Sequence, residues 1–193
     1  MPPKHDEVLV LGDGPHAGEV VELLSLVGYG AKVCSKDQEP LEVLNYRDLV
    51  LGLGNPAERI EAFARYRFTH RFLTLIHPSV VLSRTARIGE GSVLTAGVVV
   101  SSNVTLAEGV LLNWNATIGH DAVLGDCVTI GPQAAVSGHV TVGRGSMVGA
   151  GAIILQGLNV GAFSRVGAGA VVTKDVRSGA TVKGVPATEV PLR

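Results

Sequence analysis

A six-residue repeat dominates the sequence from Ile76 to about Val176. Stepping six residues at a time from Ile76, every position as far as Val172 is Ile, Leu or Val. If such residues filled about one position in three, a run of this length would arise by chance roughly once in 10⁸ trials. Neither a helix nor an ordinary strand gives this period, because their side chains repeat every 3.6 and 2 residues. The repeat therefore predicts a different architecture.

The other positions of the repeat indicate a solenoid of short extended segments joined by turns. The fourth residue after the aliphatic one is nearly always small or β-branched, as at Val80, Ala86, Ser92, Val98, Val104, Val110, Ala116 and Ala122. The residue directly after the aliphatic one is often glycine, as at Gly89, Gly119, Gly125, Gly131, Gly143, Gly149, Gly161 and Gly167. We expect the aliphatic side chains to point inward, the small ones to fit the corners, and glycine to allow a positive φ there. Stacked coils would bury one continuous column.

This pattern resembles the left-handed parallel β-helix of the hexapeptide acyltransferase superfamily over about 100 residues. We therefore expect an all-β domain at residues 75–193, with a C-terminal tail, and take the handedness from the resemblance.

Length, composition and charge narrow the classes of function. A chain of 193 residues allows one large or two small domains. The net charge of −1 and the lack of a basic run argue against nucleic acid or an anionic membrane as partner. Without a signal peptide pattern or a long apolar stretch, a soluble cytoplasmic protein is expected. Cys34 and Cys127 have no metal-ligand spacing and are interpreted as buried thiols in a reducing compartment, so no metal is expected.

Residues 1–74 are expected to form a Rossmann-like α/β domain. Strands are predicted at 7–11, 31–34 and 48–53, helices at 19–27 and 57–67, and residues 72–76 lead into the solenoid. Between the first strand and helix, Gly12, Gly14 and Ala17 fit the G-x-G-x-x-G/A spacing of a phosphate-binding turn. One βαβαβ unit suits a mononucleotide moiety, with Asp37 in reach of a ribose hydroxyl. Alternatively, the glycines only close a tight turn, and Asp13 brings a negative charge that phosphate disfavours.

Within the solenoid, residues 112–121 depart from the monotony of the repeat. They contain the only tryptophan, Trp114, the asparagines Asn113 and Asn115, and the pair His120-Asp121. This pair takes the third and fourth places of its hexapeptide, which face outward. An outward histidine is often simply solvated, but an adjacent carboxylate can hold one imidazole nitrogen and raise the basicity of the other.

The order of these two halves resembles the sugar acyltransferases of the sialic acid O-acetyltransferase type, which include the bacillosamine-pathway N-acetyltransferase. The matching stretches are residues 12–18, 113–121, 130–138, 166–176 and 183–187. The resemblance implies that His120 is the general base and Asp121 its partner. It implies contacts with a nucleotide-linked sugar, of which a UDP-amino-sugar is the expected kind, at Gly12, Gly14, Pro15, His16, Asp37, Gly54 and Asn113. It implies contacts with acetyl-CoA at Thr129, where the family often has histidine, and at Gly138, Ala150 and Ala168.

The implied reaction is acetyl transfer from the thioester to an amine or hydroxyl of the sugar, within a homotrimer and without a covalent acyl-enzyme. Two alternatives stay open. A carbonic anhydrase of the hexapeptide type needs three histidines, two of them about five residues apart, whereas residue 125 is Gly125 and His139 lies 19 residues after His120. A non-catalytic nucleotide-sugar-binding protein would keep the fold without using His120.

Overall fold

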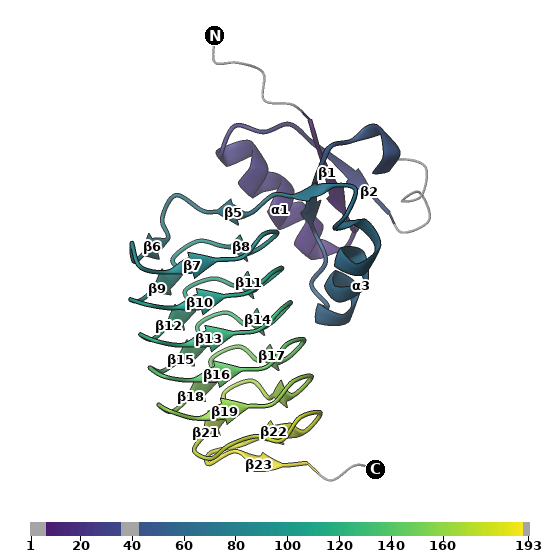
Figure 1. Ribbon diagram of the computed structural model, residues 1–193. Coiled ribbons are helices and arrows are strands. Elements are labelled where there is room, and N and C mark those ends of the chain that lie inside the picture. The colour runs from purple at the N-terminus through teal and green to yellow at the C-terminus, as the bar shows by residue number, and fades with distance from the viewer. Residues whose placement is uncertain (1–6, 36–42, 191–193) are drawn as a thin grey trace.

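The computed structural model describes residues 7–35 and 43–190. The chain begins with an α/β unit whose four parallel strands lie in the order β2-β1-β3-β4 (Figure 1). Its elements are β1 (Val8–Leu11), α1 (Pro15–Leu26), β2 (Ala31–Cys34), the 3₁₀ turn η1 (Val43–Asn45), β3 (Asp48–Leu51), α3 (Pro56–Tyr66) and β4 (Arg71–Phe72). The fully buried strand β1 sits between β2 and β3, as its continuous apolar sequence predicts.

Helix α1 begins at Pro15, four residues before the start predicted at Glu19. Gly14 has an extended conformation (φ −75°, ψ 177°) and serves as the N-cap, which places Pro15 at the first helical position. Proline suits that position because it lacks the N–H that a first turn leaves unbonded and because its φ is already helical. His16 and Ala17 therefore belong to the first turn of the helix rather than to the preceding loop.

The rest of the chain is a β-solenoid of about six turns, with three parallel sheets along its sides (Figure 1). The first face contains β5 (Leu75–Ile76), β8 (Val93–Leu94), β11 (Leu111–Leu112), β14 (Thr129–Ile130), β17 (Met147–Val148), β20 (Arg165–Val166), β22 (Thr181–Lys183) and the antiparallel β23 (Thr188–Glu189). The second contains β6 (Val81–Leu82), β9 (Val99–Val100), β12 (Thr117–Ile118), β15 (Ala135–Val136), β18 (Ile153–Ile154) and β21 (Val171–Val172). The third contains β7 (Arg87–Ile88), β10 (Thr105–Leu106), β13 (Val123–Leu124), β16 (Thr141–Val142) and β19 (Asn159–Val160).

Each coil consists of three hexapeptides, so residues 18 apart stack on one another. Leu111, for example, pairs with Val93 on one side and with Thr129 on the other. The repeating aliphatic residues from Leu94 onward are buried in a single core column. The small residues at the corners, such as Val98, Ala116 and Ala122, have no exposed surface. Both predictions about the inside of the solenoid are confirmed.

The prediction that the glycines after the aliphatic residues allow a positive φ was wrong. Positive φ occurs at a different place in the repeat, at every sixth residue from Gly91 to Gly169. The glycines that follow the aliphatic residues are needed because neighbouring coils approach closely there. A Cβ atom on Gly125 would lie 2.7 Å from the backbone nitrogen of Arg144 in the next coil.

The α/β unit packs against the first coils of the solenoid (Figure 1). The underside of α1 and β1 shares a buried apolar cluster with Val93 and Leu111 of the first face. Phe63 of α3 packs in another cluster that includes Cys127. Cys34 and Cys127 are both buried free thiols, as predicted, and burial raises the pKa of Cys127 to about 11. Among the described residues, no helix is long and apolar enough to cross a bilayer.

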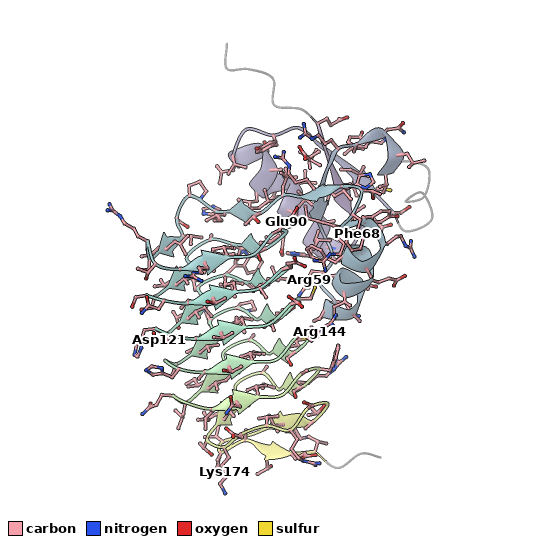
Figure 2. The ribbon with its side chains drawn as sticks, viewed as in Figure 1. Arg59, Phe68, Glu90, Asp121, Arg144 and Lys174 are labelled. Carbon is pink, nitrogen blue, oxygen red and sulfur yellow. The ribbon has the colours of Figure 1, made fainter. Side chains whose placement is uncertain are left out.

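Arg59 of α3 joins the two units (Figure 2). Its side chain is 2% exposed, and the acceptors of its hydrogen bonds among the described residues are all neutral oxygens. The acceptors are the carbonyls of Leu53, Gly54, Gly109, Cys127 and Val128 and the hydroxyl of Thr129. Burial lowers the pKa of the guanidinium to about 10, so it stays charged at neutral pH. Arg59 thus fixes the end of β3 to the solenoid backbone.

Candidate active site

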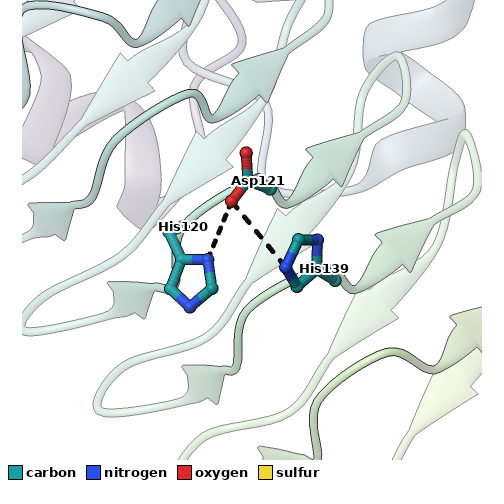
Figure 3. A group of neighbouring side chains, drawn as sticks. All are labelled: His120, Asp121 and His139. Carbon is teal, nitrogen blue, oxygen red and sulfur yellow. Dashed lines mark hydrogen bonds and ion pairs between the residues drawn. The ribbon is translucent and has the colours of Figure 1, made fainter.

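His120 and Asp121 form the turn between β12 and β13, at the corner where the second face meets the third. Consecutive residues of an extended segment would point to opposite sides. Asp121 instead has a φ of 59°, and this left-handed conformation brings both side chains together. Nδ1 of His120 lies 2.8 Å from Oδ2 of Asp121 in the same chain (Figure 3). Both side chains are largely open to solvent, at 56% and 38% exposure.

The charge on Asp121 determines which nitrogen of His120 can act as a base. The hydrogen bond from His120 lowers the pKa of the Asp121 carboxyl below its usual value, with a smaller contribution from Asn103. An ionised carboxylate only accepts hydrogen bonds, so Nδ1 of His120 must carry the proton that it donates. In the neutral imidazole, Nε2 then has a free lone pair. The dyad is therefore arranged to take up a proton at Nε2.

Gly138 of the next coil lies beside the His120 ring. A Cβ atom on this residue would come within 2.7 Å of Nε2 and 2.8 Å of Cε1 of His120. The glycine therefore leaves the space that the imidazole occupies. The family resemblance implied a cofactor contact at Gly138, and in the structure this residue lies beside the candidate base.

His139 was not predicted as a member of the site. Its Nε2 lies 3.9 Å from Oδ2 of Asp121, and its ring meets that of His120 edge-on at a centroid distance of 5.0 Å (Figure 3). Asn103, Asp121 and His139 occupy the left-handed position of three successive coils. Their spacing of 18 residues, three hexapeptides, was the signal that could have found them.

The glycine-rich loop of the α/β unit borders a cavity of about 670 Å³. The cavity opens where β1 and β3 end, and the chain leaves these strands in opposite directions across the sheet. Such a switch point is where open α/β sheets bind ligands. Its walls include the predicted residues Gly12, Gly14, Pro15, His16 and Gly54, together with Asp13 and Glu58. Asp37 lies outside the described residues.

His16 also borders a second cavity, of about 370 Å³, between α1 and the solenoid. Its Nδ1 lies 3.0 Å from Oε2 of Glu19. Trp114 lines the opposite side of this cavity. Asn113 precedes Trp114, and its side-chain oxygen accepts a hydrogen bond from the Trp114 backbone N–H at 2.8 Å. His16 therefore lies between the cavity of the predicted nucleotide loop and the cavity next to the solenoid turn that carries Asn113.

The structure does not bring all predicted cofactor residues together. The Thr129 side chain is buried, and its hydroxyl accepts a hydrogen bond from Nη2 of Arg59 at 2.7 Å. Ala150 and Ala168 are exposed and stacked in successive coils, at the corner between the first and second faces. Gly138 and His120 lie at the corner between the second and third faces.

The candidate base and the candidate nucleotide site are separate within one chain. Of the described residues that line the two cavities beside α1, none comes from the corner that carries His120. Figure 2 shows Asp121 at one edge of the solenoid, while Arg59 lies on the other side, where α3 meets the solenoid.

Comparisons with known proteins identify the family. Residues 121–156 match the family model described as bacterial transferase hexapeptide (six repeats). The acetyltransferase domain of PglB from Neisseria gonorrhoeae is 32% identical, with a TM-score of 0.90, and the match covers 95% of this chain and 99% of that one. The chain belongs to the hexapeptide-repeat acetyltransferase family.

Two further structures of family members contain ligands. The acetyltransferase domain of PglB in complex with acetyl coenzyme A matches with 32% identity and a TM-score of 0.89, over 96% of this chain and 100% of that one. PerB from Caulobacter crescentus, in complex with CoA and GDP-perosamine, matches with 29% identity and a TM-score of 0.91, over 96% and 97%. No curated protein matches the sequence. The predicted resemblance to hexapeptide-repeat sugar acetyltransferases is confirmed.

Proposed function

We propose that this hexapeptide-repeat protein transfers an acetyl group from acetyl-CoA to the amine of a nucleotide-linked amino sugar. The observation that carries the proposal is the match over both units to PerB, a protein seen with CoA and GDP-perosamine. Another matching structure from Caulobacter crescentus is described as a perosamine N-acetyltransferase. This favours an amine over a hydroxyl as the acceptor.

In the proposed reaction the sugar amine attacks the thioester carbon directly. Nε2 of His120 takes the proton that the nitrogen loses, the C–S bond breaks, and CoA leaves with the electron pair of that bond. Help of this kind from a general base is worth about 10²–10⁴ in rate. Asp121 keeps the imidazole in the required tautomer through the 2.8 Å contact at Nδ1.

The oxyanion of the tetrahedral intermediate needs a hydrogen-bond donor close to the base. Among the described residues, none accepts a hydrogen bond from the backbone N–H of Gly138. Because Gly138 adjoins the His120 ring, we assign this N–H to the oxyanion and the surrounding backbone to the thioester end of the cofactor.

We assign the nucleotide to the cavity of the glycine-rich loop. Gly14 and Pro15 present the N-terminus of α1 there, and helix N-termini favour the negative charge of phosphate. The sugar would continue past His16, which borders both cavities. Asn113, Ala150 and Ala168 remain predicted contacts along the solenoid. For Thr129 the hydrogen bond with Arg59 favours a structural role instead.

A second and third copy of the chain would complete the site. The base lies away from the sugar cavity of its own chain, so a neighbouring copy must supply one of the two halves. The second face, next to the His120 corner, carries outward apolar side chains on both sides of Thr117, and this supports a trimer. The most exposed of them are Val81, Val99 and Ile153. In a trimer, Gly138 of one copy and the Ala150–Ala168 corner of another can border one cofactor groove.

A CoA-release assay tests the proposal against its alternatives. The panel holds GDP-perosamine, UDP-linked amino sugars, their hydroxyl counterparts and free sialic acids. We expect release with at least one nucleotide-linked amino sugar. Release only with hydroxyl acceptors would make the enzyme an O-acetyltransferase. If acetyl-CoA raises the Tm but no sugar releases CoA, the non-catalytic alternative is favoured.

A further inference from the structure

The His120 corner contains more chemistry than the proposed reaction uses. Two imidazoles and a carboxylate converge there, and their three potential metal-ligating atoms lie within 4.8 Å of one another. Oδ2 of Asp121 faces Nδ1 of His120 at 2.8 Å and Nε2 of His139 at 3.9 Å (Figure 3). The acetyl transfer proposed above gives no task to His139.

These distances suit a tetrahedral transition-metal ion after small side-chain movements. With metal–ligand bonds near 2.1 Å, two tetrahedral ligands lie about 3.4 Å apart. The Asp121–His120 distance would have to open by about half an ångström, and the Asp121–His139 distance would have to close by as much. The ligating nitrogens of His120 and His139, which lie within 4.8 Å of each other, would have to reach the same separation by rotation of the two exposed rings. The exposure of all three side chains permits this movement and leaves the fourth position to water.

The fold also supports the ligands from behind. Asp121 and His139 occupy stacked left-handed positions of a regular solenoid, so their backbones are fixed relative to each other. The amide of Asn103, one coil earlier, donates a hydrogen bond at 3.2 Å to Oδ1 of Asp121, the oxygen that does not face the histidines. Outer contacts of this kind orient ligating carboxylates in metal sites.

We propose that His120, Asp121 and His139 bind a divalent transition-metal ion of the zinc type, and that the bound ion switches off the enzyme. A metal at Nδ1 of His120 leaves the proton of the neutral ring on Nε2. The base then has no lone pair for the sugar amine. Ions such as Mg²⁺ and Ca²⁺ do not compete, because they prefer a shell of oxygen ligands. The inhibitory half of this proposal rests on the proposed function, whereas metal binding does not.

The first experiment measures binding without turnover. The full-length protein is freed of metal with a chelator and titrated with Zn²⁺ by calorimetry and with Co²⁺ by visible absorption, which reports tetrahedral coordination. We expect one ion per chain in the parent protein and at least tenfold weaker binding in His139→Gln. His70→Gln, which removes a histidine from the α/β unit, is the matched control and should bind like the parent. Affinity should increase with pH, because imidazole must be deprotonated to bind a metal.

The second experiment measures inhibition, with the acetylated sugar quantified by mass because zinc also binds the thiol of released CoA. Zinc should inhibit the parent, and a chelator added afterwards should restore its activity. His139→Gln should need at least tenfold more zinc to lose the same fraction of its own metal-free rate. No zinc binding by the parent, or parental affinity in His139→Gln, would overturn the proposal and leave the acetyltransferase assignment intact. Full occupancy without loss of turnover would overturn the inhibitory half and contradict the role of His120 as base.

Discussion

At the scale of single residues, the conformation of one turn decides whether the candidate dyad exists. Asp121 adopts φ 59° without being glycine, which costs about 1 kcal/mol or more for most side chains and less for aspartate. This conformation places the Asp121 carboxylate on the same side of the turn as the side chain of His120. In the proposed mechanism, this geometry makes Asp121 a positioning residue for His120 rather than a base itself.

Replacing Asp121 with asparagine should lower kcat less than removing His120 does. The substitution leaves the imidazole in place but removes the charged acceptor that holds the proton on Nδ1, so fewer neutral rings present a free lone pair at Nε2. Because the hydrogen bond from His120 lowers the pKa of the Asp121 carboxyl, the carboxylate is present at neutral pH and is lost only as pH falls through that lowered pKa. Steady-state kinetics of the parent, Asp121→Asn and His120→Ala at neutral pH check this order. Parental kcat in Asp121→Asn would separate the carboxylate from catalysis.

Gly138→Ala should reduce kcat at least tenfold while the fold persists. The new methyl group would lie 2.7 Å from Nε2 of His120 and must displace the imidazole. Gly18→Ala is a suitable control, because a Cβ there meets nothing within 4 Å. Steady-state kinetics and circular dichroism of both variants test the prediction. Parental turnover in Gly138→Ala would show that the ring position is unimportant.

The sequence identified His120 and Asp121 as a pair but could not establish that they cooperate. Two adjacent side chains point in opposite directions in a strand but can point the same way at a corner. The hexapeptide repeat alone does not tell which residue takes the left-handed conformation. Glycine seemed the natural candidate, yet asparagine, aspartate, cysteine, glutamine, histidine and phenylalanine also occupy that position. Once the left-handed column is located, His139 follows from the 18-residue coil.

At the scale of elements, α3 holds the α/β unit on the solenoid through Arg59. The buried guanidinium satisfies carbonyl groups at the end of β3 and at two solenoid corners. None of these contacts could be predicted from sequence, because a lone arginine in an amphipathic helix is normally solvated.

The repeat predicted the solenoid well because its signal is periodic. The start of α1 was harder to predict from sequence, since proline also begins many loops.

Arg59→Met should destabilise the protein by about 3 kcal/mol or more, because several buried carbonyls lose their donor and each costs about 1–3 kcal/mol. Arg65→Met, on the exposed side of the same helix, should change stability little. Denaturant unfolding of both variants gives the comparison. Equal stability of the two would mean that Arg59 is not the link between the units.

At the scale of the whole molecule, the separation of the cavity proposed for the nucleotide-sugar from the His120 corner favours an active site shared between copies. His16→Ala should impair use of the nucleotide-sugar, and His120→Ala should remove the base. If the halves come from different copies, unfolding and refolding the two variants together should restore activity at about a quarter of the sites of a randomly mixed trimer. Light scattering should give three chains per particle. No recovery in verified mixed trimers would place both halves in one chain.

The most direct test of the account is the acetyl transfer itself, measured by mass spectrometry of the sugar product with parent protein and His120→Ala side by side. The parent should convert a nucleotide-linked amino sugar and acetyl-CoA to the N-acetyl sugar and CoA. His120→Ala should bind acetyl-CoA with similar affinity and show a kcat lower by about 10²–10⁴, because a base acts mainly in the transition state. Parental turnover in His120→Ala would contradict the proposed mechanism.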